Sequence, residues 1–308
     1  MYIAKRMLTM LITIWIVVTL TFLIMHMIPG DPFASDSNTL PEAVVENMRA
    51  RYHLDQPLPV QYVMYLKNLL TFDLGPSIQS KTTDVNTLIS RGFPPSAWIG
   101  LQAIIFAILA GVTLGSVAAL YHNRTLDYLS MIVAIIGISI PSFILAPLLI
   151  KYAAVQWRLL PVASWGTWKH TVLPSLALSV TPLAIIARFV RTSLLDVLRQ
   201  DYIHTAKAKG LSTWEVVVKH GLRNALIPVL SFMGPLFASV ITGTFVIEKI
   251  FAIPGIGKYF VDSIFNRDYP VILGTTIFYS TVLVITLFLI DILYRVVDPR
   301  IQLVSKGE

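Results

Sequence analysis

Apolar residues form six long runs along this chain, and shorter stretches between them hold most of the charge. A bilayer core about 30 Å thick needs roughly 20 apolar residues per helix. A transmembrane β-barrel would instead show alternating strands of about 10 residues. The pattern therefore predicts an all-α membrane protein with six transmembrane helices. The predicted spans cover residues 7–28, 98–120, 128–150, 171–190, 225–247 and 271–294.

Composition agrees with a membrane protein. Of 308 residues, 55% are hydrophobic and only 13% are charged, whereas soluble proteins carry about 25% charged residues. The mean hydropathy is +0.71. The chain has no cysteine, which excludes disulfides and thiolate metal sites.

The basic residues that give the net charge of +7 lie between the predicted spans or at their ends. With the N-terminus in the cytoplasm, 13 of the 24 Lys and Arg residues lie on the inner side. The inner segments are shorter in total, so their basic density is about twice that of the outer ones, as the positive-inside rule requires. We therefore expect N-in, C-in topology, and no binding of nucleic acid.

The first 97 residues are expected to form an N-terminal transmembrane helix and a long extracytoplasmic loop. The basic start "MYIAKR" resembles that of a signal peptide, but no small-x-small cleavage site follows the apolar run, so we expect the helix to be retained. Two short helices are expected in the loop, at "PEAVVENMRARYHL" and "VQYVMYLKNLL". Residues 98–308 are expected to form a core of five spans with a cytoplasmic segment at 191–224.

Proline and glycine punctuate the core. Each proline removes a backbone donor and favours a kink. Gly111 and Gly115 form a small-xxx-small pair that suits close helix packing. The prolines within or at the ends of spans are Pro141, Pro147, Pro174, Pro182, Pro228 and Pro235.

The chain has no sequence signature of its own catalytic site. A phosphate-binding loop needs Gly-x-x-x-x-Gly-Lys-[Ser/Thr], and the nearest match, "AIPGIGKY", lacks the first glycine and the hydroxyl residue. No metal-ligand spacing and no Gly-x-Ser-x-Gly elbow occurs. Asp291 is the one acid expected well inside a span, and a structural ion pair near Arg295 is favoured over a proton relay.

Residues 201–224, here called the elbow, read as helix, glycine turn, helix. The first helix is expected to begin near Ser193, which has capping-box spacing to Asp196, or to continue the fourth span. It is expected to run to Lys209, with Lys207 and Lys209 in its last turn, where the helix dipole favours cations. Gly210 is then placed for the left-handed position beyond the helix end. Ser212 and Glu215 have the spacing of a capping box, and Leu211 and Val216 that of a hydrophobic staple.

Two interpretations of the elbow follow from these residues. It is either a solvated basic loop that fixes topology, or a well-ordered helix end that inserts into another protein. The small residues Ala206 and Ala208, flanked by lysines, suit insertion into a cleft, but the residues alone leave both interpretations open. If the second holds, we expect the face of Ala206 to enter the cleft of the partner.

The stretch "DYIHTAKAKGL…HGLRNALIP" resembles the EAA loop of type I ABC importer permeases, in the form found in dipeptide, oligopeptide and nickel permeases. His204 stands where the general motif has its glutamate, so Asp201, one turn earlier, is a candidate for that role. The resemblance implies that the elbow couples to ATPase subunits. The residues so implied are Asp201, His204, Thr205, Ala206, Ala208, Gly210 and Leu211.

The resemblance extends along nearly the whole chain. "MIPGDP", "YHLDQPLPVQY", "DLGPS", "EKIFAIPGIG", "RDYP" and "DILYRVVDPR" are similar to segments of the B-type membrane subunit of the peptide permease group. It implies a second homologous permease, two cytoplasmic ATPases, an extracytoplasmic solute-binding protein and surrounding lipid as partners. It also implies no cofactor in this chain and a bacterial or archaeal plasma membrane location.

The function so implied is ATP-driven import of short peptides, in which ATPase motion at the elbow switches the pathway between inward- and outward-facing states. A nickel or glutathione permease is an alternative with the same parts. A proton-coupled carrier is an alternative of another class, which several facing intramembrane acids would support. The sequence names no residue that binds substrate.

Overall fold

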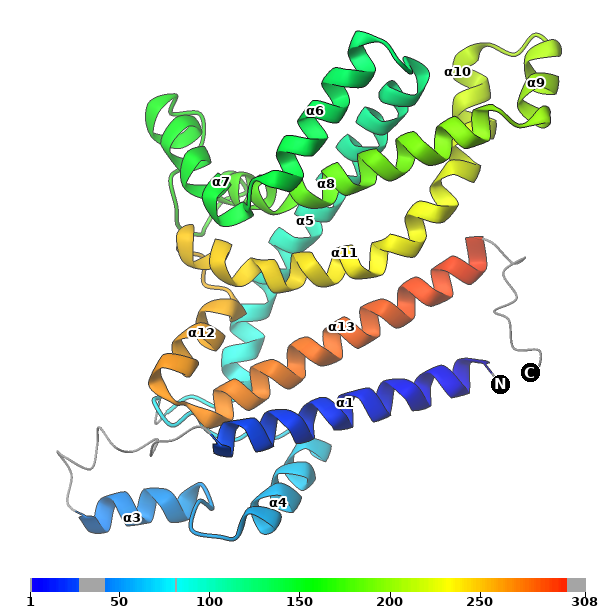
Figure 1. Cartoon of the computed structure of the whole chain (residues 1–308). Coiled ribbons are helices and arrows are strands. Elements are labelled where there is room, and N and C mark those ends of the chain that lie inside the picture. Colours follow the sequence, from blue (N-terminus) through cyan, green and yellow to red (C-terminus); the bar gives the residue numbers. More distant parts are fainter. Residues whose placement is uncertain (1, 28–41, 81, 298–308) are drawn as a thin grey trace. The chain divides into compact units, whose positions relative to one another are not determined.

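Helices occupy all six predicted apolar runs in the computed structural model, which describes residues 2–27, 42–80 and 82–297 (Figure 1). No strand occurs among these residues, apart from an isolated bridge between Pro76 and Asp84. The helices are α1 (Tyr2–Met27), α3 (Glu42–Arg51), α4 (Leu58–Leu70), α5 (Val85–Leu120), α6 (Thr125–Ser139), α7 (Ser142–Leu149), the π-helix η1 (Ile150–Gln156), α8 (Lys169–Leu198), α9 (Asp201–Ala208), α10 (Thr213–Glu215), the π-helix η2 (Val216–Leu222), α11 (Arg223–Ile250), α12 (Ile256–Asn266) and α13 (Tyr269–Val297). The predicted all-α class is confirmed for this part of the chain.

Among the residues that the structure describes, four helices are long and apolar enough to cross a bilayer unbroken. They are Lys5–Met27, Val85–Leu120, Lys169–Leu198 and Tyr269–Ile292. Two bent pairs, Thr125–Ser139 with Ser142–Gln156 and Thr213–Leu230 with Phe232–Ala238, raise the number to six if each is one span. The count of six and the N-in, C-in topology stay predictions.

The predicted span over 128–150 is broken into two helices, at the position where Pro141 was expected to favour a kink. α6 and the helix that follows it meet at an angle of 104°. Ile140 is extended, with φ −96° and ψ 111°, and Pro141 stands at the start of α7. Proline disfavours the helical conformation in the residue before it, so the chain turns at this point.

The chain divides into two compact units. One contains Met1–Pro94 and Pro254–Val284, and the other contains Pro95–Ile253 and Ile285–Glu308. The predicted functional division at residues 97 and 98 stays a prediction. The two short helices expected in the outer loop are present as α3 and α4.

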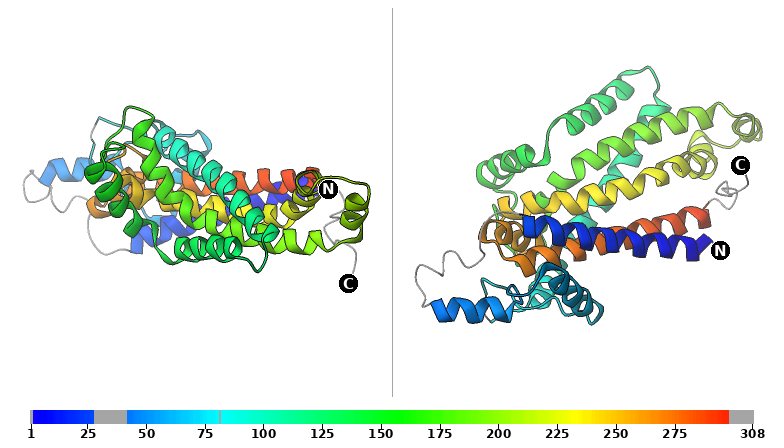
Figure 2. Two further views of the ribbon diagram at one scale, coloured as in Figure 1. Left: turned by 90° about the horizontal axis from the view of Figure 1, so that it is seen from above. Right: turned by 60° about the horizontal axis from the view of Figure 1, so that its bottom comes forward.

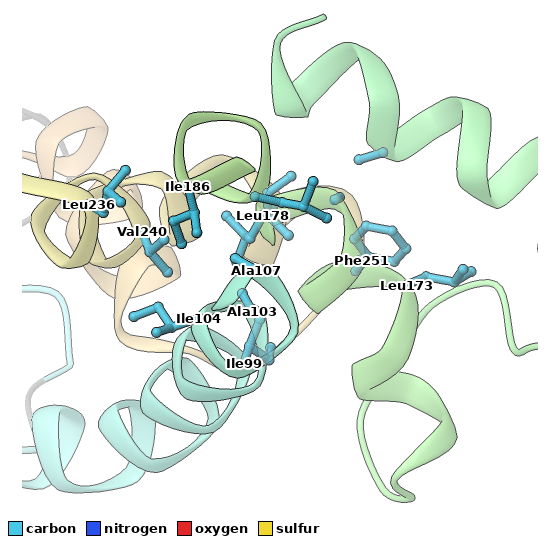
Figure 3. Packing of buried hydrophobic residues seen from close by; sticks show 14 of the residues in the cluster. Ile99, Ala103, Ile104, Ala107, Leu173, Leu178, Ile186, Leu236, Val240 and Phe251 are labelled. Atoms are coloured by element: carbon cyan, nitrogen blue, oxygen red, sulfur yellow. The ribbon is translucent and has the colours of Figure 1, made fainter. Parts of the chain in front are cut away.

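In the larger unit, α5, α8 and α11 surround one apolar core (Figure 3). Ile99 and Ala107 come from α5, Ile186 from α8 and Val240 from α11, and each is almost fully buried. α8 runs beside α11 in all three ribbon views (Figures 1 and 2). Because these helices share buried side chains over most of their length, the end of α8 and the start of α11 are fixed close together.

Close packing of α5 on α8 depends on the predicted glycine pair. A Cβ added at Gly111 would lie 2.8 Å from the carbonyl oxygen of Leu183. At Gly115 it would lie 2.5 Å from the carbonyl oxygen of Ala187. Backbone atoms cannot move aside as a flexible side chain can, so only glycine allows this approach.

In the smaller unit, Asp268 joins two of the motifs singled out above. It is buried at the start of α13, and one carboxylate oxygen accepts a 2.5 Å hydrogen bond from the hydroxyl of Ser77. The backbone N–H groups of Ile78 and Gln79 also donate to this carboxylate, at 3.2 and 3.1 Å. "DLGPS" and "RDYP" are therefore connected through one buried acid.

Candidate coupling elbow

The elbow connects the end of α8 to the start of α11 through α9, a glycine turn, α10 and η2 (Figure 1). The first helix is shorter than expected. α8 continues through Ser193 to Leu198, the chain turns at Arg199 and Gln200, and α9 spans only Asp201–Ala208. Gln200 is extended, with ψ 149°. The break lets α9 fold back and pack its apolar side against α8, which local helix preference does not predict.

Gly210 ends α9 as the sequence predicts. Its φ is +79°, in the left-handed region. The N–H of Gly210 donates to the carbonyl of Lys207 at 2.9 Å, and the N–H of Leu211 donates to the carbonyl of Ala206 at 3.4 Å. These two bonds make a Schellman motif, which satisfies carbonyl groups that the helix end would otherwise leave free.

The predicted capping box is also present. The N–H of Glu215 donates to the Ser212 hydroxyl at 3.3 Å, and the N–H of Ser212 donates to the Glu215 carboxylate at 3.2 Å. The Ser212 hydroxyl donates in turn to the same carboxylate at 2.9 Å. These hydrogen bonds, with a weaker contribution from Lys219, hold the pKa of Glu215 below its usual value. The two helix ends are therefore fixed on both sides of Gly210.

The inside of the elbow is a small apolar cluster. Ile203, Ala206 and Val216 are buried, and Leu211 packs against them. Leu211 and Val216 thus make the predicted staple. The expectation that Ala206 presents its face to a partner is wrong, because its side chain is only 6% exposed and faces this cluster. Its small size allows α9 to approach the segment that follows.

A row of four side chains faces outward instead. Asp201, His204, Thr205 and Ala208 have the i, i+3, i+4, i+7 spacing of one helix face, and all four are exposed. They lie opposite the buried pair Ile203 and Ala206. We call these four the outer row. Asp201 is in the first turn of α9, where a negative charge is favourable to the helix dipole.

Two features of the elbow were missed from the sequence. The side-chain amide of Asn224 donates to the hydroxyl of Tyr202 at 2.8 Å and links α9 to α11. Trp214 is 72% exposed at the start of the second helix. All three residues lie in the stretch singled out above, but an aromatic residue in a short helix predicts burial as readily as exposure.

Buried acids were also underestimated. Asp291 was expected to be the one acid well inside a span and is only partly buried, whereas Glu248, in the last turn of α11, is 1% exposed. Arg295 has no described side-chain surroundings, so the expected pair with Asp291 stays a prediction. Among the described residues, no three His, Asp or Glu side chains are arranged to hold a metal ion.

One cavity of about 200 Å³ lies in the smaller unit. Phe22 and His26 of α1, Tyr65 of α4 and Tyr269 of α13 contribute to its wall. One ring nitrogen of His26 lies 3.0 Å from the side-chain oxygen of Gln61. The cavity and the elbow belong to different units.

Long apolar helices, several containing proline, and a doubly capped polar elbow between two of them are the features of a multi-pass membrane protein. Two family models match the chain. The chain belongs to the family of binding-protein-dependent transport system inner membrane components, whose model matches residues 111–303, and the model of that family's N-terminal region matches residues 1–83. The resemblance inferred from the motifs is thereby confirmed.

Curated relatives match over almost the full length. The chain is 56% identical over 306 residues to the dipeptide transport system permease protein DppB of Bacillus subtilis, covering 99% of each chain. It is 43% identical over 303 residues to the oligopeptide transport system permease protein OppB of Haemophilus influenzae, covering 98% of this chain and 99% of the relative.

Solved structures show the same fold. The methionine ABC transporter MetNI, in an inward-facing conformation, matches with a TM-score of 0.57 and 20% identity, over 68% of this chain and 96% of that chain. An amino acid ABC transporter matches with a TM-score of 0.52 and 13% identity, over 68% of this chain and 93% of that chain. The chain therefore has the permease fold of type I ABC importers. It is a transport system permease subunit of the bacterial plasma membrane.

Proposed function

We propose that this chain imports dipeptides or oligopeptides as the B-type permease subunit, paired with a second permease, two cytoplasmic ATPases and an extracytoplasmic binding protein. The peptide substrate is supported by the names of the relatives, which are dipeptide and oligopeptide permeases. The two family models together cover most of the chain, so the similarity is not confined to the elbow.

The elbow is the proposed contact with an ATPase subunit. The observation that carries this is the outer row, a polar face with two small residues on a short helix whose two ends are fixed by hydrogen bonds. Small side chains allow close approach of a partner, and a fixed helix end avoids the entropy loss of ordering a loop on binding. Trp214 is exposed beside this helix, and tryptophan is enriched among residues that dominate binding energy.

The elbow is then positioned to act as a lever. α9 is packed against α8 through Ile203 and Ala206, and it is tied to α11 through the Tyr202–Asn224 hydrogen bond. A displacement of the outer row by an ATPase therefore moves the ends of both helices together. These helices line the core of the larger unit, so their movement changes the packing along the proposed pathway.

The test compares two substitutions at one position of the outer row. Arginine favours helix almost as well as alanine, and serine favours it less. If Ala208 contacts the ATPase, Ala208→Arg should weaken ATPase association by about tenfold, the effect of roughly 1.4 kcal/mol, while Ala208→Ser should change it little. If Ala208 only supports the helix, serine should be the more harmful substitution.

The assay uses the full chain co-expressed with the second permease and ATPases encoded in the same genome. ATPase co-purification is measured first. Uptake of labelled dialanine into right-side-out vesicles, with ATP inside and the binding protein outside, is measured second. The purified chain alone should hydrolyse no ATP. Full association and uptake by Ala208→Arg would refute coupling through the outer row, and uptake of nickel but not of dialanine would favour the alternative substrate.

A further inference from the structure

An ion pair joins α6 to α8, and its arginine, Arg191, lies seven residues before α8 ends. Asp127, in the first turn of α6, is 1% exposed. The Nε of Arg191 donates to one of its oxygens at 2.6 Å, and an Nη of Arg191 donates to the other at 2.7 Å. Two parallel hydrogen bonds between a guanidinium and a carboxylate fix orientation as well as distance.

The same carboxylate holds the turn between α5 and α6. The N–H of Asn123 donates to Asp127 at 2.9 Å, and Asn123 has a left-handed φ of 59°. The Nδ1 of His122 lies 3.3 Å from Asp127 and 3.2 Å from Arg191. It can donate to the carboxylate or accept from the guanidinium, but not both at once. Either way the turn is held against α8.

Small residues also bring α6 and α8 close together further along the two helices. A Cβ added at Gly137 of α6 would lie 2.9 Å from the side chain of Val180 of α8. Ala134 of α6 and Ala184 and Ala187 of α8 form a buried cluster nearby. With the glycine contacts of α5 described above, both helices of the α5–α6 hairpin lie close to α8 over much of its length.

The ion pair is close to the elbow. Arg191 precedes Leu198, the last residue of α8, by seven residues, which is about 10 Å along a helix. Between them, Leu194 packs with Ala119 at the end of α5 and with Val217 of η2. The end of the hairpin, the end of α8 and the second part of the elbow therefore share one buried cluster.

We propose that the Asp127–Arg191 pair makes the α5–α6 hairpin move with α8, so that a displacement of the elbow is passed to two further helices. The inference rests on the proposed coupling of the elbow to an ATPase. Arg191 is in this view a positioning residue for transport. Apolar packing between the helices allows sliding, whereas a bidentate ion pair loses both hydrogen bonds when α8 shifts against α6, and that resists relative movement.

The decisive measurement is a distance in the assembled transporter. Tyr121, in the hairpin turn, and Lys207, in α9, are both exposed. A cysteine introduced at each position can therefore carry a spin label. In the wild-type background the distance between the labels should stay unchanged when ATP binds, because hairpin and elbow move together. With Arg191→Lys, which keeps the charge but loses the bidentate geometry, the distance should change on ATP binding.

Transport stoichiometry provides the second readout. Arg191→Lys should assemble with the ATPases normally but transport fewer peptides for each ATP hydrolysed, by about tenfold, within the usual range of coupling between sites. The double variant Asp127→Asn with Arg191→Gln removes both charges, leaves no unpaired one, and should show the same defect. A purely structural pair would lower the amount of inserted protein and leave the ratio of peptide to ATP unchanged.

The outcomes separate the two proposals. A distance that changes on ATP binding in the wild-type transporter overturns this inference and leaves the coupling role of the elbow intact. An unchanged peptide-to-ATP ratio in Arg191→Lys and in the double variant overturns it as well. A wild-type chain that binds no ATPase overturns the proposed function, and this inference with it.

Discussion

Replacement of Gly210 tests the elbow with little steric ambiguity. Its φ of +79° is a conformation that L-residues adopt only at a cost, whereas a Cβ built at this position meets no atom within 4 Å. The effect of alanine is therefore conformational strain without a clash. The left-handed conformation costs a non-glycine residue roughly 1–2 kcal/mol, and asparagine tolerates it best. Valine, with its branched Cβ, should be worse than alanine.

The expected loss of local stability can be expressed as more frequent opening of the elbow. A cost of about 1 kcal/mol for Gly210→Ala corresponds to an increase of about fivefold in the open population. The amides of Leu211 and Glu215 report this directly, because each donates a hydrogen bond that exists only when the turn is closed. Amide exchange is measured on the whole protein and read out over residues 201–215. It should be about fivefold faster in Gly210→Ala and less affected in Gly210→Asn. In Gly210→Val, where the cost is about 2 kcal/mol, it should be about 30-fold faster.

The order of the three variants is the critical result. Exchange that is equally fast in Gly210→Asn and Gly210→Val would show that the left-handed backbone is not what holds the elbow. Unchanged exchange in Gly210→Val would contradict the assignment of the Schellman motif altogether. A matched substitution at the outer row, Ala208→Ser, leaves the turn intact and should have little effect on the amide of Leu211.

Two further predictions concern pH and topology. Hydrogen bonds from Ser212 lower the pKa of Glu215, so the contribution of the capping box should be complete above the pKa of an unfolded glutamate, about 4.3, and be lost as pH falls through the folded value. Amide exchange of the elbow followed from pH 7 to acid should show this loss, and Ser212→Ala, expected to cost about 1 kcal/mol, should remove most of the pH dependence. For topology, single cysteines at Ser37 and Thr213 should be labelled from opposite sides of the membrane by an impermeant reagent. Labelling of both from the same side would contradict the six-span arrangement.

Features that depend on neighbouring residues were predicted from the sequence alone. The left-handed conformation of Gly210 belongs to one residue, and the Ser212–Glu215 capping box and the Leu211–Val216 staple each join residues no more than five positions apart. All three features are present. The apolar runs likewise predict helices, because a segment in a bilayer must satisfy its backbone hydrogen bonds internally. Local chemistry therefore determines where the helices lie and how the elbow begins and ends.

Tertiary packing decided which faces of those helices are covered. Ala206 was expected to face a partner and is buried, because α9 folds back onto Val216 and the end of α8. Arg191 was counted only among the basic residues of the inner side, and Asp127 was not singled out. The two residues, 64 positions apart, form a bidentate pair. A small or charged residue has the same local preferences whether it faces solvent or another helix. Its role is set by contacts between distant segments, and only the three-dimensional arrangement brings those segments together.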